Sequence, residues 1–159
     1  MNLHVDIQSA SNEPLPEEGD IRGWIAAALA DREQPGDTEI SVRLVDIAEM
    51  TTLNETYRGK AGPTNVLSFP SELPDELQLP LLGDIVICAP VVRAEAAEQG
   101  KNLNAHWAHM TIHGTLHLLG YDHIAEEEAA TMEALESAIL KRLNYPCPYR
   151  EQLHREHSL

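Results

Sequence analysis

The sequence has few cysteines and no long apolar run, and each shortage excludes a class of protein. Two cysteines among 159 residues, Cys88 and Cys147, are too few for the disulfide framework of a small secreted domain. No apolar stretch approaches the ~20 residues that a membrane-spanning helix requires. The N-terminal segment also lacks the basic stretch and apolar core of a secretory signal. We therefore expect a cytoplasmic protein with no membrane partner, in which Cys88 is a small core residue.

Basic residues are also scarce. The chain has 11 Lys and Arg against 26 Asp and Glu, which gives a formal net charge of −15 at pH 7. Affinity for nucleic acid comes largely from Lys and Arg side chains that contact phosphates. The composition therefore argues against unaided tight binding of nucleic acid. An RNA substrate would need a local basic patch, the charge of a bound metal ion, or a partner that delivers it.

The apolar fraction of 43% is that of a globular protein, and the length suits a single domain over residues 1–159. Hydrophobic periodicity predicts strands over 3–7, 39–45, 65–69 and 81–88, and helices over 21–32, 46–57, 90–100, 103–119 and 125–143. This order predicts an α+β fold, with one mixed β-sheet of about four strands packed by about five helices. Asp46 and Glu49 have the spacing of a capping box. We expect the tail after about residue 146 to be frayed.

The most informative segment is HGTLHLLGYDH, over residues 113–123. His113 and His117 are four residues apart, so on a helix they project from one face, one turn apart. At Gly120 the helix can end in a left-handed conformation, and the chain can turn back to present His123. Three imidazoles leave the fourth position of a tetrahedral zinc ion open for water, as in catalytic sites. The segment therefore predicts a zinc site of His113, His117 and His123, whose bound water would ionise near neutral pH.

The same spacing occurs in the metzincin proteases, so we expect a zincin-like metal helix. Those proteases have a glutamate after the first histidine, which acts as the general base, and Gly114 stands there in this chain. His106 and His109 lie upstream on the same helix. For them a hydrogen bond to a ligand, or simple exposure, is a better interpretation than direct ligation. Asp122 could orient a ligand, although capping of the next helix is the better interpretation.

The segment over 113–123 closely resembles the histidine signature of the YbeY endoribonuclease family, HGxLHLxGYDH. Three further segments agree with that family: TYRGKAGPTNVLSFP at 56–70, LLGDIVIC at 81–88 and EAATMEALE at 128–136. The resemblance covers nearly the whole chain. The departures are Ala61, where an acid is common in the family, and Asn65, where many members have Asp.

The resemblance implies a zinc-dependent, single-strand-specific endoribonuclease. Members of the family are implicated in the maturation of ribosomal RNA, notably the 3′ end of the 16S RNA of the small subunit, and in ribosome quality control. RNA would be the substrate, and the small ribosomal subunit with its proteins would be the partner. His113, His117 and His123 map to the ligands of one zinc ion per chain. Arg58 maps to the family's functional arginine.

Arg58 lies at a predicted helix end, followed by Gly59 and Lys60. A planar guanidinium at such a place could bind a phosphate through two hydrogen bonds. Without the resemblance, an arginine that caps the helix would be the better interpretation.

Two rival functions remain open. One is a metallopeptidase, suggested by the metzincin spacing and opposed by Gly114. The other is a non-catalytic ribosome-assembly factor whose zinc ion holds the fold together, and the acidic charge suits binding to basic ribosomal proteins. No residue can be assigned as the general base from the sequence.

Overall fold

The computed structural model describes residues 3–30, 37–71, 81–121 and 125–148. Four strands and five helices lie in this part of the chain. The strands are β1 (Leu3–Ser9), β2 (Thr38–Val45), β3 (Val66–Pro70) and β4 (Leu81–Cys88). The helices are α1 (Glu18–Leu29), α2 (Ile47–Arg58), α3 (Ala89–Glu98), α4 (Leu103–Leu118) and α5 (Glu126–Arg142).

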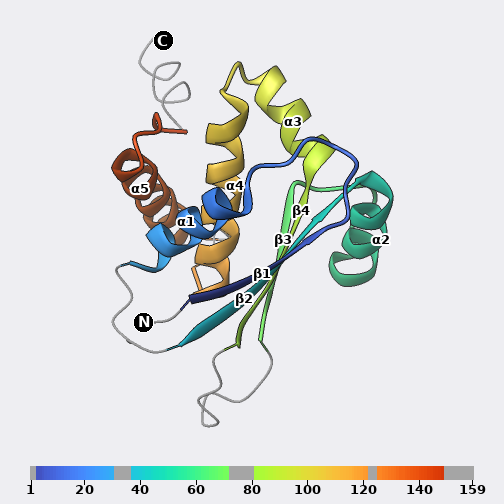
Figure 1. Cartoon of the computed structure of the whole chain (residues 1–159), viewed down its shortest axis with the longest axis horizontal. Coiled ribbons are helices and arrows are strands. Elements are labelled where there is room, and N and C mark those ends of the chain that lie inside the picture. Colours follow the sequence, from blue (N-terminus) through green and yellow to red (C-terminus); the bar gives the residue numbers. More distant parts are fainter. Residues whose placement is uncertain (1–2, 31–36, 72–80, 122–124, 149–159) are drawn as a thin grey trace.

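The strands form one sheet in the order β1-β2-β4-β3. β1, β2 and β4 run parallel to one another, and β3 pairs with β4 in the antiparallel direction. α1 and α4 pack together on one face of the sheet with α5 against α4, while α2 covers the other face (Figure 1). The predicted α+β fold with one mixed sheet is therefore confirmed. None of the described helices has the length and apolar character needed to cross a bilayer.

The strands at the centre of the sheet are apolar because both faces are covered by helices. Ile40, Val42 and Leu44 of β2 are buried on one face, and Val45 is buried on the other. Cys88, at the end of β4, is fully buried, as expected of a small core residue.

Two local predictions differ from the structure. α1 begins at Glu18 rather than at Ile21, with Glu18 and Asp20 in the first turn, where acids complement the helix dipole. The predicted capping box is wrong. Although α2 begins directly after Asp46, the Asp46 carboxylate accepts hydrogen bonds from the Ser11 hydroxyl and the Asn12 backbone N–H instead of capping the helix.

Glu49 likewise does not reach back to the start of α2. Its carboxylate pairs with the Arg43 guanidinium of the neighbouring strand, with 2.9 Å between Arg43 Nη2 and Glu49 Oε1. Both acids of the predicted capping box are therefore used in contacts with other elements.

α4 is the most buried of the described helices, and it approaches the sheet closely at Gly114. A Cβ atom at Gly114 would lie 3.0 Å from Ile85 Cγ2 and 3.2 Å from Val66 Cγ2. The Ser68 hydroxyl of β3 also donates a hydrogen bond of 2.9 Å to the Gly114 carbonyl. Position 114 therefore faces β3 and β4, and any side chain there would displace the side chains of Ile85 and Val66.

We predict that Gly114→Ala destabilises the protein by about 1–3 kcal/mol, because the added methyl group overpacks the contact with β3 and β4. Gly23→Ala is the matched control, since Gly23 lies in α1 with nothing within 4 Å of its added Cβ. That change should stabilise the protein by up to ~1 kcal/mol through helix propensity alone. Urea unfolding of both variants measures the two effects, and equal stabilisation by both would contradict the close approach of α4.

Candidate metal centre

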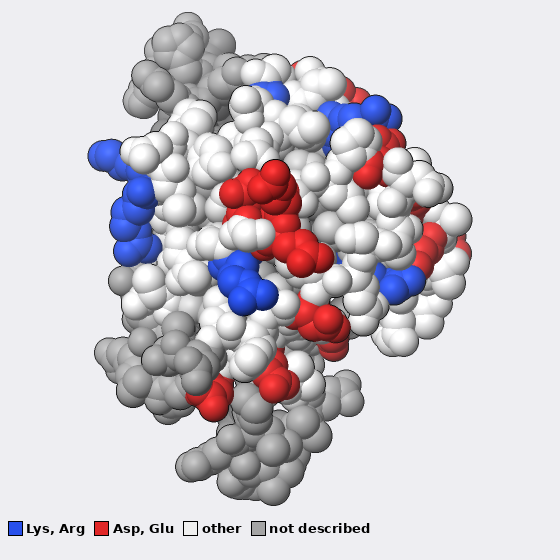
Figure 2. Space-filling view, in the orientation of Figure 1, with Lys and Arg blue, Asp and Glu red and all other residues white. Residues whose placement is uncertain are grey.

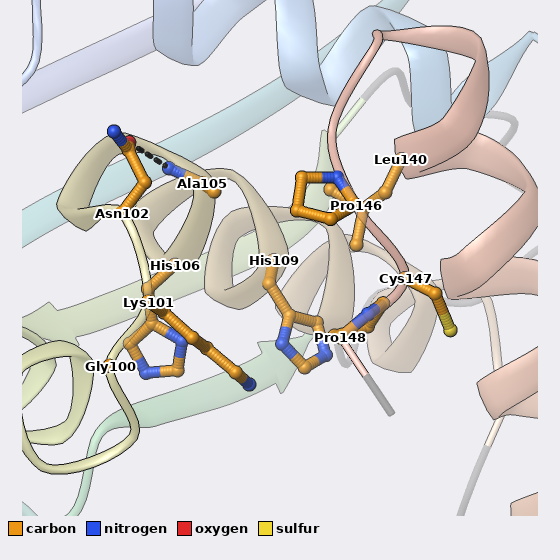
Figure 3. Close-up of a pocket in the computed structure, with 10 residues that line it drawn as sticks. All are labelled: Gly100, Lys101, Asn102, Ala105, His106, His109, Leu140, Pro146, Cys147 and Pro148. Atoms are coloured by element: carbon orange, nitrogen blue, oxygen red, sulfur yellow. Dashed lines mark hydrogen bonds between the residues drawn. The ribbon is translucent and has the colours of Figure 1, made fainter. Parts of the chain in front are cut away.

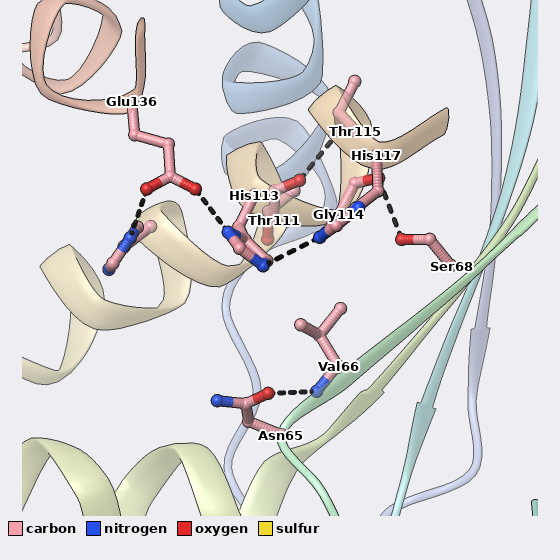
Figure 4. A network of polar contacts seen from close by, with 10 residues as sticks. Asn65, Val66, Ser68, Thr111, His113, Gly114, Thr115, His117 and Glu136 are labelled. Carbon is pink, nitrogen blue, oxygen red and sulfur yellow. Dashed lines mark hydrogen bonds and ion pairs between the residues drawn. The ribbon is translucent and has the colours of Figure 1, made fainter. Parts of the chain in front are cut away.

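Four histidines follow one face of α4. His106, His109, His113 and His117 are separated by three, four and four residues, so they lie above one another along the helix. The centroids of successive rings are 6.0, 6.2 and 4.7 Å apart. We call these four residues the histidine row. Figure 4 labels two of them, His113 and His117.

The exposure of the histidine row changes along the helix. His106 and His109 are buried, with 3% and 6% of their surface exposed. His113 and His117 are only partly buried, and the His113 side chain is 20% exposed. A ligand from solvent can therefore reach the row at His113 and His117.

The rings of His113 and His117 face each other through their Nε2 atoms, which are 3.2 Å apart (Figure 4). Two nitrogens that bind one tetrahedral zinc ion at ~2.0–2.1 Å lie about 3.3–3.4 Å apart. The observed separation matches this requirement closely. This pair of nitrogens therefore fits two ligand positions of a tetrahedral metal ion.

Glu136 of α5 lies against the histidine row and was missed by the sequence analysis. Its side chain is fully buried. One carboxylate oxygen accepts a hydrogen bond from His109 Nε2 at 3.1 Å, and the other accepts one from His113 Nδ1. The sequence did contain a signal, because Glu136 shares the buried face of α5 with Met132, Ile139 and Leu140. An acid among core positions of a helix generally has a specific partner.

The environment of Glu136 determines which groups are charged. Burial alone would raise the pKa of this carboxyl, but the hydrogen bonds from His109 and His113 outweigh it and lower the pKa to about 2. Burial also lowers the pKa of His109, although the hydrogen bond to Glu136 opposes that shift. The favoured state is therefore an ionised Glu136 that accepts N–H hydrogen bonds from both imidazoles.

His109, His113 and Glu136 also form a group that could hold a metal ion, since one ligand atom from each lies within 4.8 Å of the others. The sequence left two interpretations of His109 open, a hydrogen bond to a ligand or simple exposure. The structure rules out exposure. His109 is buried, and its Nε2 atom bonds to Glu136, which in turn bonds to His113.

A second pair of an imidazole and a carboxylate lies at the His106 end of the histidine row. His106 Nε2 lies 2.9 Å from Glu95 Oε1, and the Asn65 amide also donates to the Glu95 carboxylate at 3.2 Å. Beside His106 and His109 lies a cavity of about 210 Å³ that is bounded on the far side by Pro146 and Pro148 (Figure 3). The row therefore runs from a buried end beside this cavity to an accessible end at His117.

The other predicted site residues lie elsewhere. His123 and Asp122 fall outside the described residues. Arg58 is the last residue of α2, and its side chain is exposed. Within the described part of the chain, the Arg58 guanidinium has no hydrogen-bond or ion-pair contact with the histidine row.

The end of α2 is closed without the Arg58 side chain. The Gly59 N–H donates to the Glu55 carbonyl at 3.2 Å, and the Lys60 N–H donates to the Asn54 carbonyl at 3.4 Å. Gly59 adopts a left-handed conformation with φ of 65°, which ends the helix. Capping therefore does not require the Arg58 guanidinium.

We predict that the Glu136 carboxyl in metal-free protein titrates with a midpoint near 2 rather than near its ordinary value of 4.5. Because the pKa in the folded state is the lower one, its ionisation stabilises the fold above about pH 4.5, and that contribution is lost as the pH falls toward 2. Carbon-13 NMR of the side-chain carboxyl, over the range in which the protein stays folded, measures the midpoint. A midpoint at or above 4.5 would contradict the two hydrogen bonds from histidine.

The chain was compared with known proteins. The family model described as Endoribonuclease YbeY matches residues 6–144. A protein named Endoribonuclease YbeY from Pseudomonas syringae pv. tomato is 54% identical over 156 residues, which cover 98% of this chain and 93% of that one. One of the same name from Pseudomonas putida (strain W619) is 55% identical over 150 residues, covering 94% of each chain.

The fold also has a solved counterpart. The solution structure of TM1509 from Thermotoga maritima superposes with a TM-score of 0.58 at 23% identity, covering 88% of this chain and 91% of that chain. At this identity the match supports the fold alone. The match over most of the sequence, together with the two relatives, shows that the chain belongs to the endoribonuclease YbeY family of enzymes.

Proposed function

We propose that the protein is a zinc-dependent, single-strand-specific endoribonuclease. It would act in the cytoplasm on ribosomal RNA, in the maturation of the 3′ end of the 16S RNA and in ribosome quality control. The observation that carries this proposal is the facing pair of Nε2 atoms of His113 and His117, 3.2 Å apart, in a chain that belongs to an endoribonuclease family.

The proposed zinc ligands are His113, His117 and His123. A catalytic metal ion needs an open position for water or substrate. The partly exposed imidazoles of His113 and His117 meet this requirement, whereas Glu136 is fully buried and both of its oxygens accept hydrogen bonds. We therefore place the ion at the accessible Nε2 pair and not within the group of His109, His113 and Glu136.

A zinc ion at this site would act as a Lewis acid on the scissile phosphate and would lower the pKa of a water molecule. Arg58 would bind the phosphate oxygens and stabilise the negative charge that develops on them in the transition state. Two facts favour this role. The guanidinium is exposed, and the end of α2 is already closed by backbone hydrogen bonds.

The structure gives no support to a metallopeptidase. The general base of the metzincins would have to stand at position 114, and that position faces Ile85 and Val66 of the sheet at 3.0–3.2 Å. A glutamate side chain would have no room there. A purely structural zinc ion is also disfavoured, because His113 and His117 are partly exposed, whereas the core of the fold is formed by buried side chains.

The small ribosomal subunit is the proposed partner that delivers the RNA. The face in Figure 2 carries separate acidic and basic side chains rather than a continuous basic surface. With a net charge of −15, the protein has a shortage of the phosphate contacts that give tight unaided binding to RNA. Delivery by a ribonucleoprotein would supply the affinity that the chain lacks.

We predict that purified protein loaded with zinc carries about one ion per chain and cleaves single-stranded RNA faster than duplex RNA. His117→Ala should remove both the ion and the cleavage, because it deletes one of the two facing nitrogens. Metal analysis and an assay on paired and unpaired RNA, with a peptide library as the control substrate, measure this. Cleavage of peptides, or a zinc-loaded protein that leaves RNA and intact small subunits uncut, would contradict the proposed function.

Arg58→Ala should lower the rate of RNA cleavage by a factor on the order of 10²–10³, the usual scale for one electrostatic donor. The melting temperature and the zinc content should be unchanged, since an exposed charged side chain contributes under ~1 kcal/mol to stability. Arg58→Lys should restore only part of the rate, because a point charge cannot reproduce the planar guanidinium. Full cleavage by zinc-loaded Arg58→Ala protein would remove Arg58 from the active site.

A further inference from the structure

We propose that Glu136 is a positioning residue for the metal centre: it holds the proton of His113 on Nδ1 and so keeps Nε2 available to bind the metal ion. This inference rests on the proposed function, since it takes His113 and His117 as ligands. It assigns a role to a fully buried residue on α5.

The contact between His113 Nδ1 and Glu136 determines the tautomer of His113. A neutral imidazole carries its proton on one of two nitrogens, and only the other nitrogen has a lone pair for a metal ion. An ionised carboxylate can only accept hydrogen bonds. Because His113 Nδ1 bonds to Glu136 Oε1, the proton of His113 must lie on Nδ1. The lone pair is then on Nε2, which is the atom that faces His117.

The orientation of the Glu136 carboxylate is fixed by a second contact. The other oxygen of Glu136 accepts a hydrogen bond from His109 Nε2 at 3.1 Å, so the carboxylate cannot rotate away from His113 without losing that bond. His109 is itself buried one turn before His113 on α4. The backbone of α5 near Glu136 is fixed by the buried side chains of Met132 and Leu140. The carboxylate is therefore held from both sides, and it sets the orientation of the His113 ring.

The Glu136 charge is buried between two imidazoles of the histidine row. Burial of a carboxylate destabilises the folded protein unless its lone pairs accept hydrogen bonds. Glu136 has no exposed surface, so it is not needed for solubility, and its two oxygens point at two imidazoles of the histidine row (Figure 4). Support of a ligand is the established use of such a carboxylate, and loss of it typically weakens metal binding about 10–100-fold.

Glu95 provides a matched control. It also pairs with a histidine of the same row, with 2.9 Å between His106 Nε2 and Glu95 Oε1. His106 is two helical turns from His113 and is not a proposed ligand. Glu95→Gln therefore changes a carboxylate–imidazole pair of the same kind without touching the metal centre.

The experiment measures zinc affinity by competition with a chelating dye in the wild-type protein, Glu136→Gln and Glu95→Gln. We expect Glu136→Gln to bind zinc about 10–100-fold more weakly, because an amide can donate to His113 Nδ1 and so favour the tautomer with the proton on Nε2. Glu95→Gln should stay within about twofold of the wild type. Equal affinities in all three proteins would overturn the inference, and no binding by the wild type would instead contradict the proposed function.

Nitrogen-15 NMR of histidine side chains in metal-free protein gives a second, independent measurement. It reports which ring nitrogen carries the proton, and a residue that only supports the fold would not control that choice. In the wild type we expect the His113 proton on Nδ1, and in Glu136→Gln we expect part or all of it on Nε2. A wild-type His113 with its proton on Nε2 would overturn the inference, even if the variant failed to fold.

Discussion

Glu136 carries a negative charge in a place that is shielded from solvent, and two imidazoles of α4 make that charge tolerable. Burial of a carboxylate is strongly unfavourable on its own. Here hydrogen bonds from His109 and His113 reverse the effect, so that the pKa of Glu136 falls to about 2. The same contacts join α5 to α4 and fix the side chain of His113. In the proposed site, the orientation of His113 in the accessible Nε2 pair therefore depends on one buried electrostatic contact between two helices.

The two sides of α4 differ in the residues that they require. Toward the sheet it must be small and apolar, as at Gly114, which approaches Ile85 of β4. Along the other side it carries the histidine row, which changes from buried at His106 to accessible at His117. A metal site on a well-packed helix is held more precisely than one on a loop. The packing of α4 also explains why the glutamate of the metzincins is absent here, since position 114 belongs to the core side.

The sequence predicted local features well and contacts between distant elements poorly. The four strands and five helices of the described residues follow from hydrophobic periodicity, and the histidine spacing placed His113 and His117 on one face. The predicted capping box is wrong because Asp46 bonds to Ser11, 35 residues away, and Glu49 of α2 bonds to Arg43 of β2. Glu136 was missed for the same reason, since its partners lie 23 and 27 residues earlier. The only signal for Glu136 in the sequence is its place among the core residues of α5. No rule of residue spacing connects Glu136 to a histidine on another helix.

We propose that the metal ion binds at Nε2 of His113 and His117, with Glu136 on the opposite nitrogen of His113. A crystal structure of zinc-loaded protein, with anomalous scattering at the zinc edge, tests it most directly. We expect a zinc ion at ~2.0–2.1 Å from both Nε2 atoms, with a third imidazole from His123. The Glu136 carboxylate should remain hydrogen-bonded to His113 Nδ1 and make no bond to the metal ion. A zinc ion bound instead by His109 and the Glu136 carboxylate would show that this placement of the metal ion is wrong.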